Sequence, residues 1–324
     1  MKRLAIVVPC FNEEEVLPIT VPELERVIFE LIQAQKISVD SQIVFVDDGS
    51  HDQTWPLIEH FTDSDDHVTG IKLSRNFGHQ DALIAGLTSV VSSFDAVVTI
   101  DADLQDDVNA IKQMVDCFLA GAEVVYGVRS SRQTDTWFKR STAEGFYKTM
   151  NFLGVHMVPD SADFRLLSQR ATQTLLDYPE RNLFLRGIVP LLGFRSAKVS
   201  YERHARVAGV SKYPLKKMIR FAVDGITSFS TAPIKLIMNL GFLIVLICIG
   251  LLIYTLVQKI QGRVVSGWSS LMISVWALGG VQLICISVIG EYVGKIFTEV
   301  KQRPRFTIER NLLQEQIEAK SSNK

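Results

Sequence analysis

Two long uncharged stretches near the C-terminus limit what this chain can fold into more than any other feature. Residues 236–257 and 268–290 contain no charged side chain. A helix of about 22 residues is roughly 33 Å long, close to the thickness of the hydrocarbon core of a bilayer. One such stretch could be a buried core helix, but two in tandem favour a pair of transmembrane helices. Because only residues 258–267 connect them, we expect a transmembrane hairpin within residues 233–293.

Basic residues flank this predicted hairpin on both sides. The basic side chains before it and after it are Lys212, Lys216, Lys217, Arg220 and Lys235, and Lys295, Lys301, Arg303 and Arg305. The connector has only Lys259 and Arg263. Because positively charged flanks stay in the cytoplasm, we expect both termini on that side of the membrane. The apolar segment at residues 4–9 is too short for a signal peptide, so the domain before the hairpin should also remain in the cytosol.

The region just before the hairpin is strongly basic, although the net charge of the chain is -1. Residues 195–235 contain nine basic and two acidic side chains. Such a belt is typical of a surface for anionic headgroups or phosphates, and a solvated flank that only fixes the topology is the alternative. Within it, residues 214–232 are predicted to form an amphipathic juxtamembrane helix. An aromatic-rich segment at 137–153 could lie on the membrane surface or pack against the preceding domain.

The first part of the chain alternates short apolar stretches with amphipathic ones. Strands are expected at 4–9, 42–46, 68–73, 96–100 and 123–128, and helices at 22–35, 53–61, 80–91 and 108–119. Strands that alternate with helices indicate an α/β fold with a doubly wound, mostly parallel sheet. Ligands of such sheets bind beyond the carboxyl ends of the strands. The polar tail after Arg310 is expected to fray.

Polar clusters follow four of the predicted strands. They are residues 11–13, 47–50, 74–78 and 101–107. One polar strand end is ordinary, because the helix after it needs a cap. Four in succession, rich in carboxylates and without a glycine-rich phosphate loop, favour a nucleotide site that relies on a metal ion.

The last of these clusters suggests where the metal would bind. An apolar run at residues 97–100 stops at Asp101 and Asp103. Side chains alternate between the faces of a strand, so both carboxylates would leave its end on the same side and could hold one hard divalent cation. Asp106 and Asp107 are expected to cap the next helix, where its dipole favours negative charge. The four cysteines show no paired spacing, so neither a disulfide framework nor a zinc site is predicted.

Several motifs together resemble one known family. They are Val8–Glu14 (VPCFNEE), Val46–Ser50 (VDDGS), Asp101–Gln105 (DADLQ) and the terminal pair of apolar stretches. This combination is similar to the family-2 glycosyltransferases, whose GT-A fold is the nucleotide-diphospho-sugar transferase type. Within that family it most resembles the polyprenyl-phosphate glycosyltransferases, which include the dolichyl-phosphate mannose synthases. Finer motifs resemble the bactoprenol glucosyltransferase branch. These are Asn76–Gly78, Asp163–Leu166, Pro179–Phe184, Gly225–Ser230 and Gly290–Gly294.

The resemblance implies a division of the chain and a set of donor-site residues. Residues 1–213 would be a cytosolic GT-A catalytic domain, followed by the juxtamembrane helix, the hairpin and a cytoplasmic tail at 294–324. The nucleotide sugar would contact Pro9, Phe11, Glu13, Asp47, Asp48, Asp101 and Arg129. The alternative for Glu13 and Asp48 is that they only cap helices. Asp101, Asp103 and Gln105 would bind Mg²⁺ or Mn²⁺, which bridges the donor diphosphate.

The acceptor side is implied in less detail. Asp163 occupies the position of the catalytic base in the matching motif. However, a phosphate monoester has a second pKa of about 6, so near neutral pH it needs little base catalysis. Asp163 could instead orient the acceptor or a neighbouring arginine, and both roles stay open. Arg129, Arg203, Arg206 and Lys212 are candidates for holding phosphates.

The implied reaction is the transfer of a hexose, with inversion, from a UDP-sugar to undecaprenyl or another polyprenyl phosphate at the cytoplasmic face of the bacterial plasma membrane. Glucose from UDP-glucose is the favoured donor, and the product would serve the modification of a surface polysaccharide. The same chemistry on GlcNAc, 4-formamido-arabinose or mannose from GDP-mannose is the first alternative. A tethered nucleotide-sugar-binding scaffold without turnover is an alternative of another class.

The expected partners follow from that reaction. They are the UDP-sugar, polyprenyl phosphate and the lipid bilayer, and no nucleic acid is expected. Relatives of this kind suggest a homo-oligomer. Gly241, Gly250, Gly279 and Gly280 could allow the predicted spans to pack closely, although small residues are common in such helices.

Overall fold

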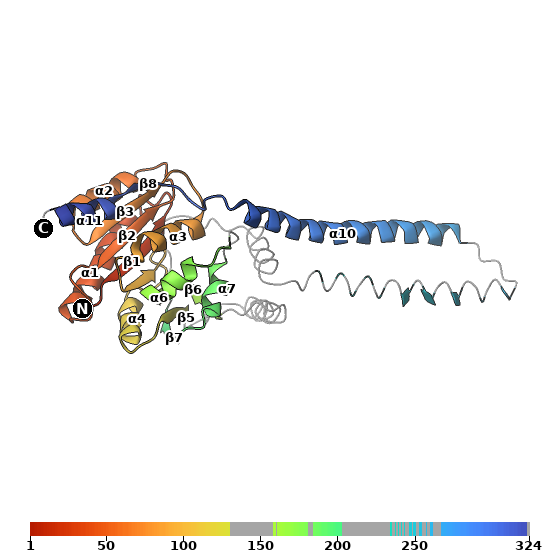
Figure 1. The fold of residues 1–324 in the computed structure, drawn as a ribbon, viewed down its shortest axis with the longest axis horizontal. Coiled ribbons are helices and arrows are strands. Elements are labelled where there is room, and N and C mark those ends of the chain that lie inside the picture. Colours follow the sequence, from red (N-terminus) through yellow and green to blue (C-terminus); the bar gives the residue numbers. More distant parts are fainter. Residues whose placement is uncertain are drawn as a thin grey trace. The chain divides into compact units, whose positions relative to one another are not determined.

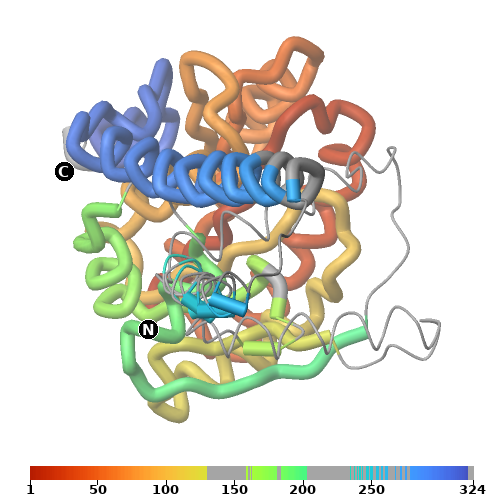
Figure 2. Tube along the Cα trace, turned by 90° about the vertical axis from the view of Figure 1, so that its right-hand side faces the viewer, coloured from red at the N-terminus to blue at the C-terminus, as the bar shows by residue number. Residues whose placement is uncertain are grey.

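A computed structural model describes residues 1–129, 158–159, 161–180, 184–202 and 267–322, together with scattered positions between 234 and 261. The rest of the chain is the grey trace in Figures 1 and 2. The chain divides into two compact units. The first comprises Met1–Tyr147, His156–Tyr213 and Arg303–Lys324, and the second comprises Lys148–Val155 and Pro214–Gln302.

The first unit is built on an eight-stranded sheet with the order β7-β5-β6-β4-β1-β2-β3-β8. Its strands are β1 (Leu4–Cys10), β2 (Gln42–Asp47), β3 (Val68–Leu73), β4 (Ala96–Thr99), β5 (Val124–Arg129), β6 (Ser161–Ser168), β7 (Ser196–Tyr201) and β8 (Ile308–Asn311). Its helices are α1 (Leu17–Gln33), α2 (Thr54–Ser64), α3 (His79–Val90), α4 (Ala110–Leu119), α6 (Gln169–Leu176), α7 (Leu185–Leu191) and α11 (Leu312–Ser322). The predicted α/β alternation of residues 4–128 is confirmed, with boundaries shifted by a few residues.

The largest boundary error concerns α1, which begins at Leu17 rather than at residue 22. Pro18 occupies its first turn and Pro22 lies inside the helix. The first N–H groups of a helix have no internal partner, so Pro18 costs nothing there, whereas Pro22 gives up one hydrogen bond. Pro22 was therefore mistaken for the start of the helix.

The sheet is mixed rather than mostly parallel. Strands β3, β2, β1 and β4 run parallel to one another, as predicted. However, β6 lies antiparallel between β4 and β5, and β7 pairs parallel with β5 at one edge. The insertion of β6 is a long-range pairing that a local hydrophobic pattern does not reveal. It brings the start of β6 to the edge where β1, β2 and β4 end.

Helices cover both faces of this sheet (Figure 1). Side chains of α1, α2 and α4 join Ile6, Val8 and Phe45 in one buried cluster. On the other face α3 packs so closely that a Cβ on Gly86 would lie 2.4 Å from the Val7 side chain. Strands covered on both faces are apolar throughout, and each large side chain buried in this way contributes about 1.5–3 kcal/mol.

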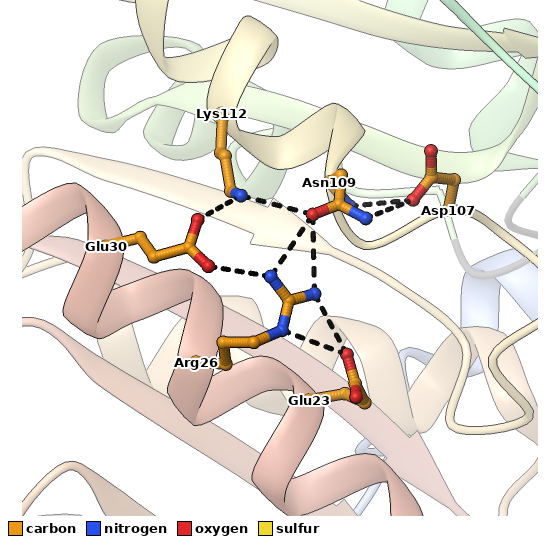
Figure 3. A network of polar contacts seen from close by, with 6 residues as sticks. All are labelled: Glu23, Arg26, Glu30, Asp107, Asn109 and Lys112. Atoms are coloured by element: carbon orange, nitrogen blue, oxygen red, sulfur yellow. Dashed lines mark hydrogen bonds and ion pairs between the residues drawn. The ribbon is translucent and has the colours of Figure 1, made fainter.

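Polar contacts also connect α1 to the start of α4 (Figure 3). Arg26 donates to Glu23, Glu30 and Asn109, and Lys112 donates to Glu30 and Asn109. These side chains are partly exposed. Exposed ion pairs contribute little each, so the buried cluster beneath them holds the two helices together.

The C-terminal tail is part of the first unit, so the expectation that it frays was wrong. Strand β8 pairs antiparallel with β3, and the backbone N–H of Ser74 donates to the Thr307 carbonyl at 3.0 Å. In α11, Leu312 and Leu313 are buried. A four-residue strand carries almost no local signal, but it satisfies the otherwise unpaired edge of β3.

The second unit contains α10 (Trp268–Lys301), a helix of 34 residues. Its segment Leu278–Lys301 is, within the described residues, the one stretch of helix long and apolar enough to cross a membrane. The described positions between 234 and 260 are helical. The transmembrane hairpin is therefore not confirmed, and its first helix stays a prediction. The segments predicted at 137–153 and 214–232 lie outside the described residues.

Candidate active site

The four predicted polar clusters meet at one edge of the sheet. Parallel pairing aligns Cys10 with Asp47, so the loops after β1 and β2 lie side by side. The register of β6 pairs Arg165 with Thr99, which places Asp163 beside the residues that follow β4. Strands β5 and β7 end at this same edge with Arg129 and Tyr201. The site is thus assembled from strand ends of both the parallel and the mixed half of the sheet.

Asp48 organises the loop between β3 and α3. Its carboxylate accepts hydrogen bonds from the backbone N–H groups of Phe77 at 2.7 Å and Gly78 at 2.9 Å. Burial raises the pKa of Asp48, although these two N–H groups act in the opposite direction. Next to it, Gly49 has a φ of +67°, and a Cβ there would lie 2.4 Å from the Arg75 carbonyl carbon. The two loops are therefore in direct contact.

Asp47 is fully buried at the end of β2. Its Oδ1 accepts from the Ser50 N–H at 3.2 Å, whereas its Oδ2 has no hydrogen-bond partner among the described residues. Burial raises the pKa of Asp47. A buried carboxylate oxygen without a partner is costly, and a hydrogen-bond donor on a bound ligand would remove that cost.

The loop after β1 is fixed to the loop after β2. The backbone N–H of Asn12 donates to the Ser50 hydroxyl at 2.9 Å, and that of Glu13 donates to the Thr54 hydroxyl at 2.8 Å. Phe11 and Glu13 are half-buried at this position, beside the buried Pro9. The structure thus brings together the residues predicted to contact the nucleotide, namely Pro9, Phe11, Glu13, Asp47 and Asp48.

Asp101 and Asp103 lie in a turn rather than on a strand, because β4 already ends at Thr99. The turn is held at Ala102, whose buried carbonyl accepts from the Thr20 hydroxyl at 2.7 Å. Leu104 adopts a φ of +52°, and the Gln105 N–H donates to Asp103 Oδ1 at 3.2 Å. The prediction that strand alternation presents the two acids was wrong in its geometry. The two acids lie instead on either side of Ala102, which the Thr20 hydroxyl holds to the core.

These acids fit a metal that also binds a diphosphate. The Asp101 side chain is 44% exposed. Partial burial raises its pKa, and neighbouring carboxylates raise it further, while His79 acts in the opposite direction. No group of three or more His, Cys, Asp or Glu in the described ranges is arranged to hold a metal unaided. Mg²⁺ is usually held by one or two carboxylates together with substrate phosphates, so Asp101, Asp103 and Gln105 suit such a shared site.

Asp163 is the centre of a cluster formed by two arginines and a histidine. One carboxylate oxygen contacts Arg165, and the other lies 3.2 Å from Arg186 Nη2 and 4.0 Å from His79 Nε2. The same His79 nitrogen lies 3.5 Å from Asp101 Oδ1. Burial acts to raise the pKa of Asp163, but Arg186 and Arg165 outweigh it and lower this pKa to about 2. His79 therefore lies between the predicted metal ligand and the predicted catalytic residue.

Asp106 does not cap α4, contrary to expectation. It is buried, accepts a hydrogen bond from the Tyr201 hydroxyl at 2.6 Å and lies 3.7 Å from Arg129. Burial and this acid raise the pKa of Tyr201. Asp107, by contrast, accepts from the Asn109 N–H at the start of α4. Asp106 was misread because two adjacent acids before a helix look alike in sequence, although one faces β7.

Three residues of the site were not predicted from the sequence, and three predicted ones are not described by the structure. His79, Arg186 and Tyr201 were not predicted. His79 directly follows the Asn76–Gly78 motif, and Arg186 lies two residues after the Pro179–Phe184 motif, so a search for charged residues beside those motifs could have found both. Tyr201 has no such signal. The predicted phosphate-binding residues Arg203, Arg206 and Lys212 lie outside the described residues.

Carboxylates and arginines thus gather where the strands of this mixed α/β sheet end, an arrangement that suits phosphate-bearing ligands. The chain belongs to glycosyl transferase family 2, whose family description matches residues 5–176. It is therefore a glycosyltransferase.

Two relatives match almost the whole chain. An uncharacterised glycosyltransferase of Bacillus subtilis, YkoT, is 52% identical over 97% of this chain and 93% of its own length. A bactoprenol glucosyl transferase of Shigella phage SfX is 40% identical over 94% of this chain and 98% of its own length. A solved structure of glucosyl-3-phosphoglycerate synthase from Mycobacterium tuberculosis, in complex with Mn²⁺, UDP and phosphoglyceric acid, has a TM-score of 0.44 and 17% identity over 70% of this chain and 76% of that chain.

Proposed function

We propose that this glycosyltransferase moves a hexose, with glucose from UDP-glucose as the favoured donor, onto undecaprenyl or another polyprenyl phosphate. The observation that carries the proposal is the 40% identity to a bactoprenol glucosyl transferase along nearly the whole of both chains. The arrangement of the site agrees with two phosphate-bearing substrates, because carboxylates for a metal and arginines for an anion lie within a few side chains of each other. The product would be a lipid-linked sugar for modifying a surface polysaccharide.

On the donor side, we assign the nucleotide to the loops after β1 and β2. Phe11 offers a half-buried aromatic ring, and it lies beside the buried Asp47, whose Oδ2 has no hydrogen-bond partner among the described residues. Glu13 and Asp48 line the same edge, where Asp48 fixes the neighbouring loop. Asp101, Asp103 and Gln105 would hold Mg²⁺ or Mn²⁺, which when bound neutralises charge on the leaving diphosphate. Arg129, held near Asp106, would contact the same diphosphate.

On the acceptor side, an oxygen of the lipid phosphate attacks the anomeric carbon as the bond to the nucleoside diphosphate breaks, with inversion. This step needs no proton transfer if the phosphate is already a dianion, and its second pKa is about 6. A carboxylic acid with a pKa of about 2 is a weak base for such a task. We therefore favour Asp163 as a positioning residue over Asp163 as a base. Arg203, Arg206 and Lys212 remain proposed phosphate contacts.

The proposed membrane arrangement keeps the division of the chain expected from the sequence, except that the C-terminal tail joins the catalytic unit. The catalytic domain at 1–213, the juxtamembrane helix at 214–232 and the hairpin at 233–293 remain proposals, with the catalytic domain at the cytoplasmic face of a bacterial plasma membrane. The segment Leu278–Lys301 supports a membrane anchor by its length and composition. Residues 303–324 belong with the catalytic unit rather than to a separate tail. A homo-oligomer remains an expectation.

A donor panel tests the proposal. Membranes containing the full chain are incubated with polyprenyl phosphate, Mg²⁺ or Mn²⁺ and labelled UDP-glucose, UDP-GlcNAc, UDP-4-formamido-arabinose or GDP-mannose. Lipid-linked glucose is the expected product, and its loss in Asp103→Asn but not in Asp107→Asn would locate the metal site. Transfer of another sugar alone would move the assignment to that sugar. Absence of any lipid-linked product would refute the proposed acceptor.

A further inference from the structure

The loop that carries the three proposed metal ligands is fixed to the core at two points. One is the carbonyl of Ala102, which accepts from the Thr20 hydroxyl of α1 at 2.7 Å. The other is the side chain of Asp106, which is 4% exposed and accepts from the Tyr201 hydroxyl, at the end of β7, at 2.6 Å. Two of the proposed ligands lie between these points in the sequence. The loop is therefore held on both sides of the residues that would bind the metal.

The backbone of this loop needs such support. Leu104 has a φ of +52°, a left-handed conformation that residues with a side chain rarely adopt. A conformation of this kind persists only where the surrounding structure fixes it. The Leu104 side chain packs against the buried cluster of the sheet. If the contact at Asp106 were lost, the left-handed turn would keep its energetic cost and lose one of the contacts that stabilise it.

Tyr201 is itself held in position by its neighbours. Its ring packs edge-on against that of Phe164 on β6, with the ring centroids 5.3 Å apart, and both side chains are buried. Its backbone is aligned with that of Arg129 in the parallel register of β5 and β7. A buried tyrosine hydroxyl requires a hydrogen-bond partner, and Asp106 supplies one. The place of Asp106 is thus set by strands β6 and β7 as well as by its own loop.

Asp106 also faces Arg129, the arginine proposed to contact the donor diphosphate. The oxygen that accepts from Tyr201 lies 3.7 Å from Arg129 Nη2. The Arg129 side chain is 32% exposed, so part of it is accessible to a ligand while the acid beside it is buried. One carboxylate therefore joins the loop with the proposed metal ligands to the end of β5. A metal-bound diphosphate requires both its metal ligands and its arginine at fixed positions.

We propose that Asp106 and Tyr201 are positioning residues, which hold the metal-binding loop and Arg129 in the arrangement that a metal-bound nucleoside diphosphate requires. This inference rests on the proposed function, in which the loop binds Mg²⁺ or Mn²⁺ together with the donor diphosphate. Neither residue would touch the substrate. Their effect is on the affinity for the metal-bound diphosphate, because groups that are already in place lose less conformational entropy on binding.

Binding of UDP by the full-length protein in detergent tests the inference without any transfer reaction. Isothermal titration calorimetry in the presence of Mn²⁺ gives the dissociation constant of UDP, and the same titration with uridine gives that of a ligand without the diphosphate. Tyr201→Phe should weaken UDP binding by about three- to tenfold, as expected for the loss of one hydrogen bond, and uridine binding by less than about twofold. Tyr178→Phe, at a half-buried tyrosine, is the matched control and should bind both ligands as the wild type does.

A second variant tests the contact between Asp106 and Arg129. In Asp106→Asn the amide oxygen can still accept from the Tyr201 hydroxyl, but the charge beside Arg129 is lost, so UDP should bind more weakly. Arg129→Gln should weaken UDP binding directly. The double variant should bind UDP no more weakly than Arg129→Gln alone, because both changes act on one guanidinium, and additive effects would overturn the link between Asp106 and Arg129. Asp107→Asn, at the neighbouring acid that accepts from the Asn109 N–H, is the matched control.

The outcomes separate the inference from the function beneath it. If the wild type binds UDP with Mn²⁺ but forms no lipid-linked sugar, the proposed acceptor fails, whereas selectively weaker UDP binding by Tyr201→Phe would still support the inference. If Tyr201→Phe lowers the unfolding temperature and leaves the affinity for UDP unchanged, the hydroxyl has a structural role alone and the inference is wrong. Equal weakening of UDP and uridine would also overturn it, because the loops around the base would then have moved. A wild type whose affinity for UDP does not depend on Mn²⁺ would overturn it as well.

Discussion

The two sides of the site hold their carboxylates in different ways. On the donor side, Asp48 accepts from the backbone N–H groups of Phe77 and Gly78, and Asp47 accepts from that of Ser50. On the acceptor side, Asp163 is held by guanidinium groups. Burial raises the pKa of Asp47 and Asp48, whereas the arginines lower that of Asp163 to about 2. Backbone contacts fix the shape of a loop, while the guanidinium groups place positive charge beside Asp163.

This difference corresponds to the substrates that each side would receive. A nucleotide base is neutral and is recognised by shape and by hydrogen bonds, which loops fixed through backbone groups provide. A lipid phosphate is an anion and is recognised by charge. On this interpretation, removing a donor-side acid such as Asp48 should loosen a loop. Removing Asp163 should instead take away the carboxylate that the buried Arg165 contacts.

The largest effect is expected for Asp163→Ala. This change leaves Arg165 buried without its counter-ion, which typically costs about 3–5 kcal/mol of unfolding free energy. Denaturant unfolding followed by tryptophan fluorescence would measure it. Because the folded-state pKa lies below that of the unfolded chain, the stabilisation should be complete above about pH 4 and be lost only as the pH falls toward 2.

Asp101→Ala is the matched control for that measurement. Its side chain is 44% exposed, so its loss should abolish activity while changing the stability by less than about 0.5 kcal/mol. Equal destabilisation by both variants would mean that the acceptor side is not distinguished by a buried ion pair.

Asp48→Ala should have the next largest effect. Two backbone N–H groups in the loop before α3 would lose a charged acceptor, with an expected cost of about 2–3 kcal/mol. The loop would loosen, so KM for UDP-glucose should rise more than KM for the lipid phosphate. Asp66→Ala, at an exposed acid before β3, is the control. A selective rise in KM for the lipid would contradict the assignment of this loop to the donor.

The strand ends that form the proposed donor side were largely predictable from sequence, and those that form the proposed acceptor side were not. The parallel strands β1–β4 each have an apolar run followed by polar residues, so the places of Asp47, Asp48, Asp101 and Asp103 follow from the sequence alone. Their arrangement obeys a rule, because parallel strands end at one edge. Asp163 was found only through a family motif, since its place depends on β6 entering antiparallel between β4 and β5.

Two of the three residues that were missed share a physical cause. Arg186 and Tyr201 reach the site from elements far along the chain, and each is defined by its contact with one buried acid. Such contacts leave no periodic pattern in a sequence. The error about the tail is of the same kind, because β8 is specified by the open edge of β3 rather than by its own four residues.

A smaller effect is expected for Tyr201→Phe, next to Arg129 at the ends of β5 and β7. The change removes the hydroxyl that donates to buried Asp106 at 2.6 Å, while Arg129 remains 3.7 Å away to balance the charge. The expected loss is about 1–2 kcal/mol, measured by denaturant unfolding. Tyr178→Phe, at a half-buried tyrosine, should change little. A loss as large as that of Asp163→Ala would show that the buried Asp106 contributes as much to stability as the ion pairs of Asp163 do, and would break the contrast.

The smallest effect is expected at the outer edge of the donor side, where Lys72 of β3 lies 2.9 Å from Glu309 of β8. Both side chains are partly exposed, so Lys72→Gln should lower the free energy of unfolding by at most about 0.5 kcal/mol. The rate at which proteases cleave the tail should not increase. The tail is held instead by backbone pairing of Ile71 with Asn311 and by the burial of Leu313. Limited proteolysis and unfolding measure both quantities. The contrary outcome is that Lys72→Gln releases the tail and that the charge exchange Lys72→Glu with Glu309→Lys restores its attachment. In that case an ion pair would hold this edge of the sheet as well, and the contrast with Asp163 would not extend to it.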